Sequence, residues 1–278
     1  MALARRLVVV ALLAFAAPWP AQAGAAWERW LAHDPRGTVR VDHGAWSRFL
    51  ASYLVMGRDG ITRVAYARVT PADRAALAAY LDRLAATPIS GARRDEQRAF
   101  WIDLYNALTV KVVLDHYPVG SIRDIDISPG LFADGPWGAK LVTVEGVALS
   151  LDDIEHRILR PIWKDPRLHY ALNCASLGCP NLMPQAFTAA NTERLLETAA
   201  RAYVNHPRGA RVVEGRLTVS SLYRWYAEDF GGSDAGVIAH LRRYARGPLA
   251  RALAGVRQIS GDGYDWSLND AATAGHTS

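Results

Sequence analysis

"DEQRAFWIDLYNALTVKVVLDHYP", residues 95–118, is the stretch of this chain that decides the fold. It predicts a long helix from about Gln97 to His116, which Pro118 ends. Apolar side chains occupy most of the circumference of this helix, a pattern typical of a helix at the centre of a domain. We therefore expect a core that is built around one buried helix.

Two shorter helices are predicted upstream of this central helix. In "VTPADRAALAAYLDRLAAT", Thr70 is the expected N-cap, Pro71 takes the first helical position, and Asp73 occupies the capping-box position. The stretch "AWSRFLASYLV", residues 45–55, repeats its apolar residues at the same helical spacing. The first part of the chain is thus expected to be helical.

Strand patterns appear in the middle of the chain. "KLVTVEGVALSL" and "ARVVEGRLTVSS" predict hairpins with two-residue turns at Glu145-Gly146 and Glu214-Gly215. "RLHYALNC" alternates as a strand does, and "RQIS" is a further strand candidate. Together with the helices, these patterns predict the α+β class: a helix-rich single domain with a small, mainly antiparallel sheet made of the hairpins and these two segments.

The beginning of the chain, "MALARRLVVVALLAFAAPWPAQA", has the pattern of a secretory signal peptide over residues 1–23. Arg5 and Arg6 give a basic start, an apolar run follows, and "AQA" is a small-x-small cleavage signal. The apolar run is too short to span a bilayer, and no later stretch is apolar enough to do so. We expect a mature chain that begins near Gly24 and is periplasmic or secreted, with no transmembrane segment.

Composition is compatible with one well-packed domain and gives no sign of a nucleic-acid partner. Half of the residues are hydrophobic, enough for a full core. Without Arg5 and Arg6 the net charge falls from +5 to +3, and the remaining basic residues are scattered instead of forming the patch that nucleic acid requires. We expect a single globular domain over residues 24–269 and a disordered tail over residues 270–278.

Five separated phrases resemble the family known as domain of unknown function 547, which occurs in bacteria and in plants. They are "AFWIDLYNALTVKVVLDHYP", "VTVEGVALSLDDIEHRILR", "DPRLHYALNCASLGCPNL", "VSSLYRWYAEDFGG" and "GYDWSLN". The resemblance runs from about Val41 to Asn269, and Asp103 departs from it because the family usually has asparagine there. The resemblance implies no settled activity. It also implies a distant likeness to the folds of papain and transglutaminase, which are thiol enzymes.

Both cysteines lie in "HYALNCASLGCPNL", residues 169–182, and they allow a reactive thiol, a metal site or a disulfide loop. A thiol enzyme needs a thiolate, a base in contact with it and a group that orients the base. Cys174 is the candidate nucleophile, because it ends a predicted strand and enters a turn rich in Ala, Ser and Gly. The backbone N–H groups of that turn are candidate donors to an oxyanion.

The helix after the first hairpin supplies the candidate base, His156. Ser150 is the expected cap, and Ile154 and Ile158 lie on the buried stripe. His156 falls almost opposite this stripe, so it faces solvent, a cleft or a packed element; the alternative is a plain surface histidine. Glu155 falls at the edge of the stripe, where we expect a structural acid paired with an arginine.

Asn106 is the candidate group that orients the imidazole, although a bond to the backbone of a neighbouring loop is the alternative. His169 is a poor partner for Cys174, since residues five apart in a regular strand point to opposite faces. We expect Cys174 at the mouth of a polar cleft, on the same side as His156.

A disulfide between Cys174 and Cys179 is the structural alternative. It would close a six-residue loop and contribute about 2 kcal/mol by the chain-entropy relation. Gly178 and Pro180 fit a fixed turn, and export favours oxidation. Structural zinc needs four ligands at a recognisable spacing, and a thioredoxin-type site needs two residues between its cysteines. We therefore expect no metal and no cofactor.

Two functional hypotheses follow for this exported chain. The first is a thiol-dependent hydrolase or acyl transferase that uses Cys174, His156 and Asn106. The second is a non-catalytic binding or assembly domain, in which a Cys174–Cys179 disulfide stiffens a loop. A metal-dependent envelope protein ranks behind both. The substrate or envelope partner is not specified by the sequence in any of these cases.

Overall fold

The computed structural model describes residues 27–130 and 134–272 of the chain. The predicted signal peptide and the predicted mature start at Gly24 lie outside the described residues, as do residues 273–278 of the predicted tail.

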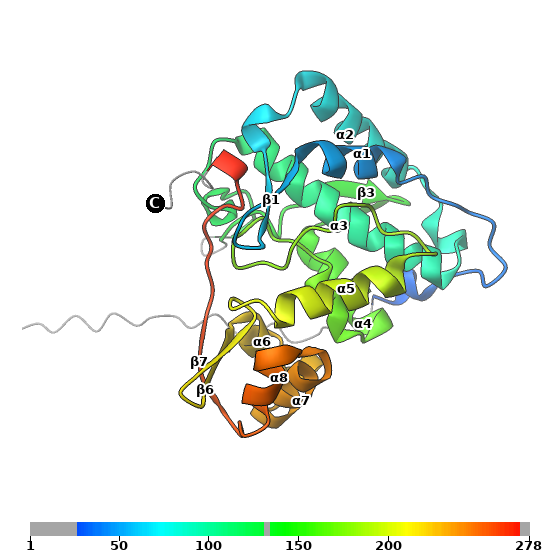
Figure 1. Ribbon diagram of the computed structural model, residues 1–278. Helices are drawn as coiled ribbons and strands as arrows, with labels where there is room; N and C mark the ends of the chain where they lie inside the picture. Colours follow the sequence, from blue (N-terminus) through cyan, green and yellow to red (C-terminus); the bar gives the residue numbers. More distant parts are fainter. Residues whose placement is uncertain (1–26, 131–133, 273–278) are drawn as a thin grey trace, which may run out of the picture.

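Helices and strands alternate irregularly along the described chain (Figure 1). The helices are α1 (Gly44–Tyr53), α2 (Pro71–Ala85), α3 (Arg94–His116), α4 (Arg160–Trp163), α5 (Thr192–Val204), α6 (Leu222–Trp225), α7 (Asp234–Tyr244) and α8 (Gly247–Leu253). The strands are β1 (Leu54–Met56), β2 (Thr62–Val64), β3 (Val142–Val144), β4 (Val147–Leu149), β5 (Ala210–Val213), β6 (Arg216–Ser220) and β7 (Ile259–Gly263).

The predicted central helix is α3, and every residue from 99 to 110 is buried. Its apolar circumference is therefore enclosed on all sides, as the sequence predicts. The capping of α2 is also confirmed: Pro71 is its first residue, and the Thr70 side chain accepts a hydrogen bond from the Asp73 backbone N–H at 3.1 Å.

Both predicted hairpins form, as β3–β4 and β5–β6. Glu145 and Gly146 have φ of 47° and 78°, and Glu214 and Gly215 have φ of 50° and 73°. Positive φ at both central positions is the backbone geometry of a type I′ turn, whose twist matches that of the paired strands.

The helix-rich α+β class is confirmed, but the expectation of one sheet is wrong. The strands form three small sheets, β1–β2, β3–β4 and β5–β6–β7. The predicted "RQIS" strand is represented by β7, which pairs with β6 in parallel, starting with Leu217 opposite Ile259.

The predicted "RLHYALNC" strand is wrong as well. Pro166–Tyr170 is a 3-10 helix, which begins with proline and is capped by the Asp165 carboxylate accepting from the Arg167 N–H at 2.9 Å. The apparent alternation came from a turn whose last three residues are all buried. The argument that His169 and Cys174 point to opposite faces of a strand therefore does not apply.

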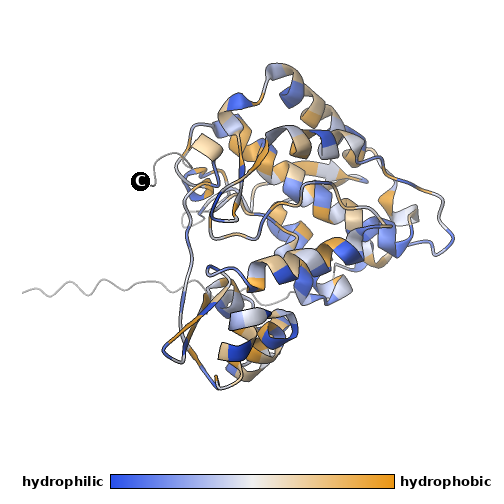
Figure 2. Ribbon diagram, in the orientation of Figure 1, coloured by the Kyte–Doolittle hydropathy of each residue, from blue (hydrophilic) through white to orange (hydrophobic). Residues whose placement is uncertain are grey.

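The described residues contain two hydrophobic clusters. The larger cluster surrounds α3, and the smaller cluster lies among β5–β7, α7 and α8 in the lower part of Figure 1. Figure 2 shows hydrophobic residues in both parts. Helix α5 contributes Leu195 and Leu196 to the larger cluster and Ala200 and Tyr203 to the smaller, so it joins the two.

A disordered tail was expected from residue 270, but the chain is still packed against the fold at this position. Asp270 is buried, and its carboxylate accepts a hydrogen bond from the Tyr117 hydroxyl at 2.7 Å. Within the described residues, no helix combines the length and the apolar character that crossing a membrane requires.

Candidate functional site

The two cysteines meet in the loop that follows the 3-10 helix Pro166–Tyr170. Cys174 is partly exposed and Cys179 is buried. Their sulfur atoms lie 2.8 Å apart. This separation exceeds the roughly 2.05 Å of a disulfide bond, so both residues are free thiols in this structure. The backbone N–H of Cys174 also donates to Cys179 Sγ at 2.8 Å.

Two hydroxyl groups complete the surroundings of the Cys174 sulfur. The Tyr264 hydroxyl lies 3.0 Å from it and the Ser176 hydroxyl 3.3 Å. Burial raises the pKa of Cys174, but the hydrogen bonds from Cys179, Ser176 and Tyr264 outweigh it and hold that pKa below its usual value. Burial, the hydrogen bond to Cys174 and the charge of Cys174 raise the pKa of Cys179 well above its usual value.

Buried asparagines hold the loop that carries Cys174. Asn106, on α3, donates to the Ala171 carbonyl and accepts from the Asn173 N–H, both at 2.9 Å. The Asn173 side chain in turn donates to the Pro180 carbonyl at 2.7 Å and accepts from the Ala175 N–H at 2.9 Å. Asn106 therefore bonds to the backbone of the loop that leads to Cys174. This is the alternative to orienting an imidazole.

The residue after Cys174 has an unusual backbone conformation. Ala175 is buried and has φ of 58°, a region that residues with a Cβ atom seldom adopt. The Ala175 N–H donates to the Asn173 side-chain oxygen, and the Ala175 carbonyl accepts from the Asn269 N–H at 3.0 Å; these bonds keep the chain in this turn. Such strained turns occur at functional sites more often than elsewhere.

Most backbone N–H groups of the loop are already used within the fold. Leu177 and Gly178 donate to the carbonyls of Ser267 and Asp265, both at 2.8 Å, and Cys179 donates to the Ser176 carbonyl at 3.2 Å. A Cβ atom on Gly178 would lie 2.8 Å from the Asp265 backbone nitrogen, so this contact requires glycine. These N–H groups are not free for an oxyanion, contrary to the expectation for this turn.

A largely buried polar cluster forms around His169, in the 3-10 helix that precedes the loop. His169 Nε2 lies 2.6 Å from an Asp229 carboxylate oxygen, which also accepts from Arg160 Nε at 2.6 Å. The His169 ring stacks on Tyr226, with centroids 4.2 Å apart, and its Nδ1 lies 3.8 Å from Glu155. Burial raises the pKa of Asp229, but His169 and Arg160 outweigh it and lower that pKa to about 2.

Glu155 and Tyr226 connect this cluster electrostatically with the thiols. The charge of Glu155 raises the pKa of Cys174, though less strongly than burial does. Burial raises the pKa of Tyr226 well above its usual value, and the charges of Glu155 and Cys174 add to this. Ionisation of Cys174 is therefore coupled to the charge of Glu155 and to the ionisation of Tyr226.

His156 has different neighbours from those expected. Its Nδ1 lies 3.0 Å from Arg160 Nη1, and its Nε2 lies 3.6 Å from an Asp152 carboxylate oxygen. Within the described ranges, none of its contacts reaches Cys174. The His156 side chain is 21% exposed, so it is neither a fully exposed surface histidine nor a fully packed one.

A π-helical turn, Asp153–Leu159, explains how Glu155 and His156 are presented. The backbone N–H of Arg160 bonds to the Glu155 carbonyl, five residues back, instead of the usual four. Ile154 and Ile158 are fully buried, as predicted, but Glu155 is buried too. The capping by Ser150 is confirmed, because its hydroxyl accepts from the Asp153 N–H at 3.1 Å.

Aromatic residues that the sequence did not connect with the cysteines border the site. The Tyr264 ring lies 4.8 Å from Trp225 and 4.7 Å from Trp266, between ring centroids, and all three side chains are partly exposed. Tyr264 and Ser176 were not predicted as site residues. Tyr264 is 90 residues from Cys174 along the chain, and only the fold brings them together.

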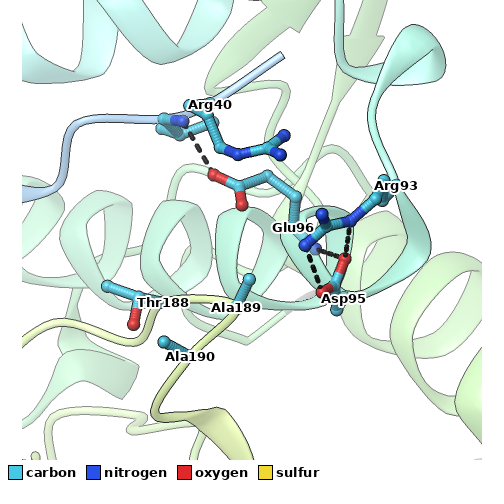
Figure 3. Close-up of a pocket in the computed structure, with 8 residues that line it drawn as sticks. Arg40, Arg93, Asp95, Glu96, Thr188, Ala189 and Ala190 are labelled. Atoms are coloured by element: carbon cyan, nitrogen blue, oxygen red, sulfur yellow. Dashed lines mark hydrogen bonds and ion pairs between the residues drawn. The ribbon is translucent and has the colours of Figure 1, made fainter. Parts of the chain in front are cut away.

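Two surface cavities lie away from the cysteines. Figure 3 shows one of about 380 Å³ at the start of α3, where Glu96 accepts from the Val41 N–H at 2.8 Å and Arg93 pairs with Asp95. The other, of about 450 Å³, lies between α2, α3 and the β3–β4 hairpin, and Lys111 is one of its lining residues. Cys174 lines neither cavity.

No group of three or more metal-binding side chains lies together in the part of the chain that the structure describes.

Comparison with known proteins gives one result. Residues 89–204 match the model of a family described as "Protein of unknown function, DUF547". The match confirms the resemblance to this family. It covers a shorter range than Val41 to Asn269 and includes α3, the β3–β4 hairpin, the π-helical turn and both cysteines. Searches of curated proteins and of solved structures give no significant match.

Proposed function

We propose that this chain is an exported thiol enzyme, a hydrolase or acyl transferase, and that Cys174 is its nucleophile. The observation that carries the proposal is the set of hydrogen bonds that link the sulfur of Cys174, a partly exposed residue, with Cys179, Ser176 and Tyr264, and that lower the pKa of this thiol. The thiolate is the nucleophilic form of cysteine. A lowered pKa increases the thiolate fraction of Cys174 at a given pH without an imidazole in contact.

The same hydroxyl groups are placed to assist acyl transfer. When the Cys174 thiolate attacks a carbonyl carbon, negative charge moves from sulfur to the carbonyl oxygen. Burial raises the pKa of Tyr264 well above its usual value, followed by the charges of the two cysteines, so its hydroxyl keeps its proton and remains a donor. The hydroxyl of Ser176 lies 3.1 Å from that of Tyr264. The hydroxyl groups of Tyr264 and Ser176 can therefore donate to this oxygen in place of the backbone N–H groups, which are already hydrogen-bonded within the fold.

Hydrolysis of the thioester also needs a group that takes a proton from water. We assign this role to Glu155 in place of His156, because Glu155 is buried, its carboxylate lies 3.8 Å from His169 Nδ1, and its charge is one of the causes that act on the pKa of Cys174. Asn106 is a positioning residue, since it holds the backbone on the N-terminal side of Cys174.

The test uses the reduced mature chain and p-nitrophenyl acetate as an acyl donor. Intact-mass measurement should find one acetyl group on Cys174, and Cys174→Ala should abolish the adduct. Glu155→Gln should form the adduct at least as fast as the wild type, because the charge that raises the pKa of Cys174 is gone, but should lose it more slowly, which separates hydrolysis from acylation. His156→Ala is the matched control and should leave both steps unchanged. Acetylation that persists in Cys174→Ala would exclude this nucleophile.

A non-catalytic binding or assembly domain is the second candidate, and the 2.8 Å approach of the two sulfur atoms favours it. Oxidation to a Cys174–Cys179 disulfide would consume the nucleophile and stiffen the loop. In that case the native mature chain resists iodoacetamide until it is reduced, and no acyl adduct forms on it. Mass measurement without reductant, with and without iodoacetamide, separates the two candidates.

A further inference from the structure

We propose that Cys174 and Cys179 form a redox-active dithiol that exchanges with disulfides, with Cys174 as the attacking thiol and Cys179 as the resolving thiol. This activity goes beyond acyl transfer, because it uses the same nucleophile but needs no acyl group. Its substrate class is a disulfide accessible from solvent, in a small molecule or on a protein surface.

The two sulfur atoms differ in the way that exchange requires. Cys174 is partly exposed and can meet an incoming disulfide, whereas Cys179 is only 4% exposed and cannot. Their separation of 2.8 Å lets Cys179 reach the Cys174 sulfur without unfolding of the loop. Opposite shifts of the two pKa values favour a thiolate on Cys174 and a thiol on Cys179.

The first step forms a mixed disulfide. The Cys174 thiolate attacks one sulfur of the substrate disulfide, the substrate S–S bond breaks, and the second substrate sulfur leaves as a thiolate that takes a proton from solvent. The negative charge on Cys174 disappears in this step. That charge is one of the causes that raise the pKa of Cys179, after burial and the hydrogen bond to Cys174. Formation of the mixed disulfide therefore makes Cys179 easier to ionise.

The second step closes the protein disulfide. Cys179 releases its proton to solvent, and the Cys174 N–H, 2.8 Å away, stabilises the thiolate that results. This thiolate attacks the Cys174 sulfur, the mixed disulfide breaks, and the remaining substrate thiolate takes up a proton. In total, the protein dithiol is oxidised by two electrons and the substrate disulfide is reduced to two thiols.

The four-residue spacing does not oppose this activity. The spacing of a thioredoxin-type motif serves to bring two sulfurs together at one exposed and one buried position, and the loop achieves this through Ala175 at positive φ and the bonds of Asn173. The sequence argued only against a thioredoxin-type motif, because spacing along the chain does not reveal how close the two sulfur atoms lie in the fold.

The test treats the reduced chain with oxidised glutathione and follows intact mass and free thiols. The wild-type chain should end as an intramolecular disulfide without an adduct, after releasing two glutathione molecules. Cys179→Ser should stop with one glutathione on Cys174 and release only one. Cys174→Ser should gain no adduct, because Cys179 is buried. Cys179→Ala provides a second resolving-cysteine variant in case the serine variant fails to fold.

Stable glutathione on wild-type Cys174, an adduct on Cys179 in Cys174→Ser, or no reaction of the wild type would each overturn the proposal. The acetylation test is independent of these outcomes. A chain that exchanges with glutathione but forms no acetyl adduct retains this inference and loses the proposed acyl chemistry. The reverse result retains the acyl chemistry alone.

Discussion

The substitution Asp229→Asn tests whether the polar cluster beside the thiols is stabilised by charge. The Asp229 side chain is 20% exposed, and it contacts Arg160 and His169, whose side chains are both only 2% exposed. Its pKa is lowered to about 2 from a usual value of about 4. A difference of about two pKa units corresponds to about 2.5 kcal/mol of stability at neutral pH.

The pH dependence of this loss follows from the sign of the shift. Because the pKa is lower in the folded chain, the carboxylate contributes fully above pH 4 or so, and the contribution disappears as the pH falls through about 2. Urea unfolding at pH 7, 5 and 3 should therefore show the full loss for Asp229→Asn at pH 7 and 5 and a smaller one at pH 3.

Glu228→Gln is the matched control, since it removes one exposed carboxylate from the neighbouring position. It should change the free energy of unfolding by less than about 0.5 kcal/mol. An Asp229→Asn loss that equals the control at pH 7, or that is as large at pH 3 as at pH 7, would refute the role assigned to this charge.

Three further predictions concern stability and export. Burial raises the pKa of Asp103 well above its usual value, so Asp103→Asn should raise the melting temperature at neutral pH; a lower one would contradict this. Asn106→Ala removes two buried hydrogen bonds and should cost about 2–3 kcal/mol in urea unfolding, with slower alkylation of the loop thiol; unchanged values would contradict the positioning role. N-terminal sequencing of exported protein should begin at or near Gly24, and a sequence that begins with Met1 would exclude processing.

Local features of the fold were predictable because a few neighbouring residues determine them. Thr70, Pro71 and Asp73 begin α2 through bonds within one turn. The Glu145-Gly146 turn follows from the need for two positive φ values at the end of a tight hairpin. The buried helix α3 was predictable because its apolar residues lie on all sides.

The site itself depends on features that sequence periodicity does not reveal. A regular helix would place Glu155 at the edge of the buried stripe, but the π-helical turn changes the phase and buries it. The hydroxyl groups that lower the pKa of Cys174 include Tyr264, which reaches the loop only through the folded C-terminal segment. The nucleophile was therefore identifiable as a candidate, whereas its chemical surroundings were not.

The most direct test of the central claim is the pH dependence of Cys174 alkylation in the reduced mature chain. Iodoacetamide labelling at a series of pH values, followed by peptide mass mapping, measures the thiolate of each cysteine separately. The structure predicts labelling of Cys174 with a midpoint below the roughly 8.5 of an ordinary cysteine, while Cys179 stays unlabelled in the folded chain. A midpoint at or above that value for Cys174, or equal labelling of both cysteines, would contradict it.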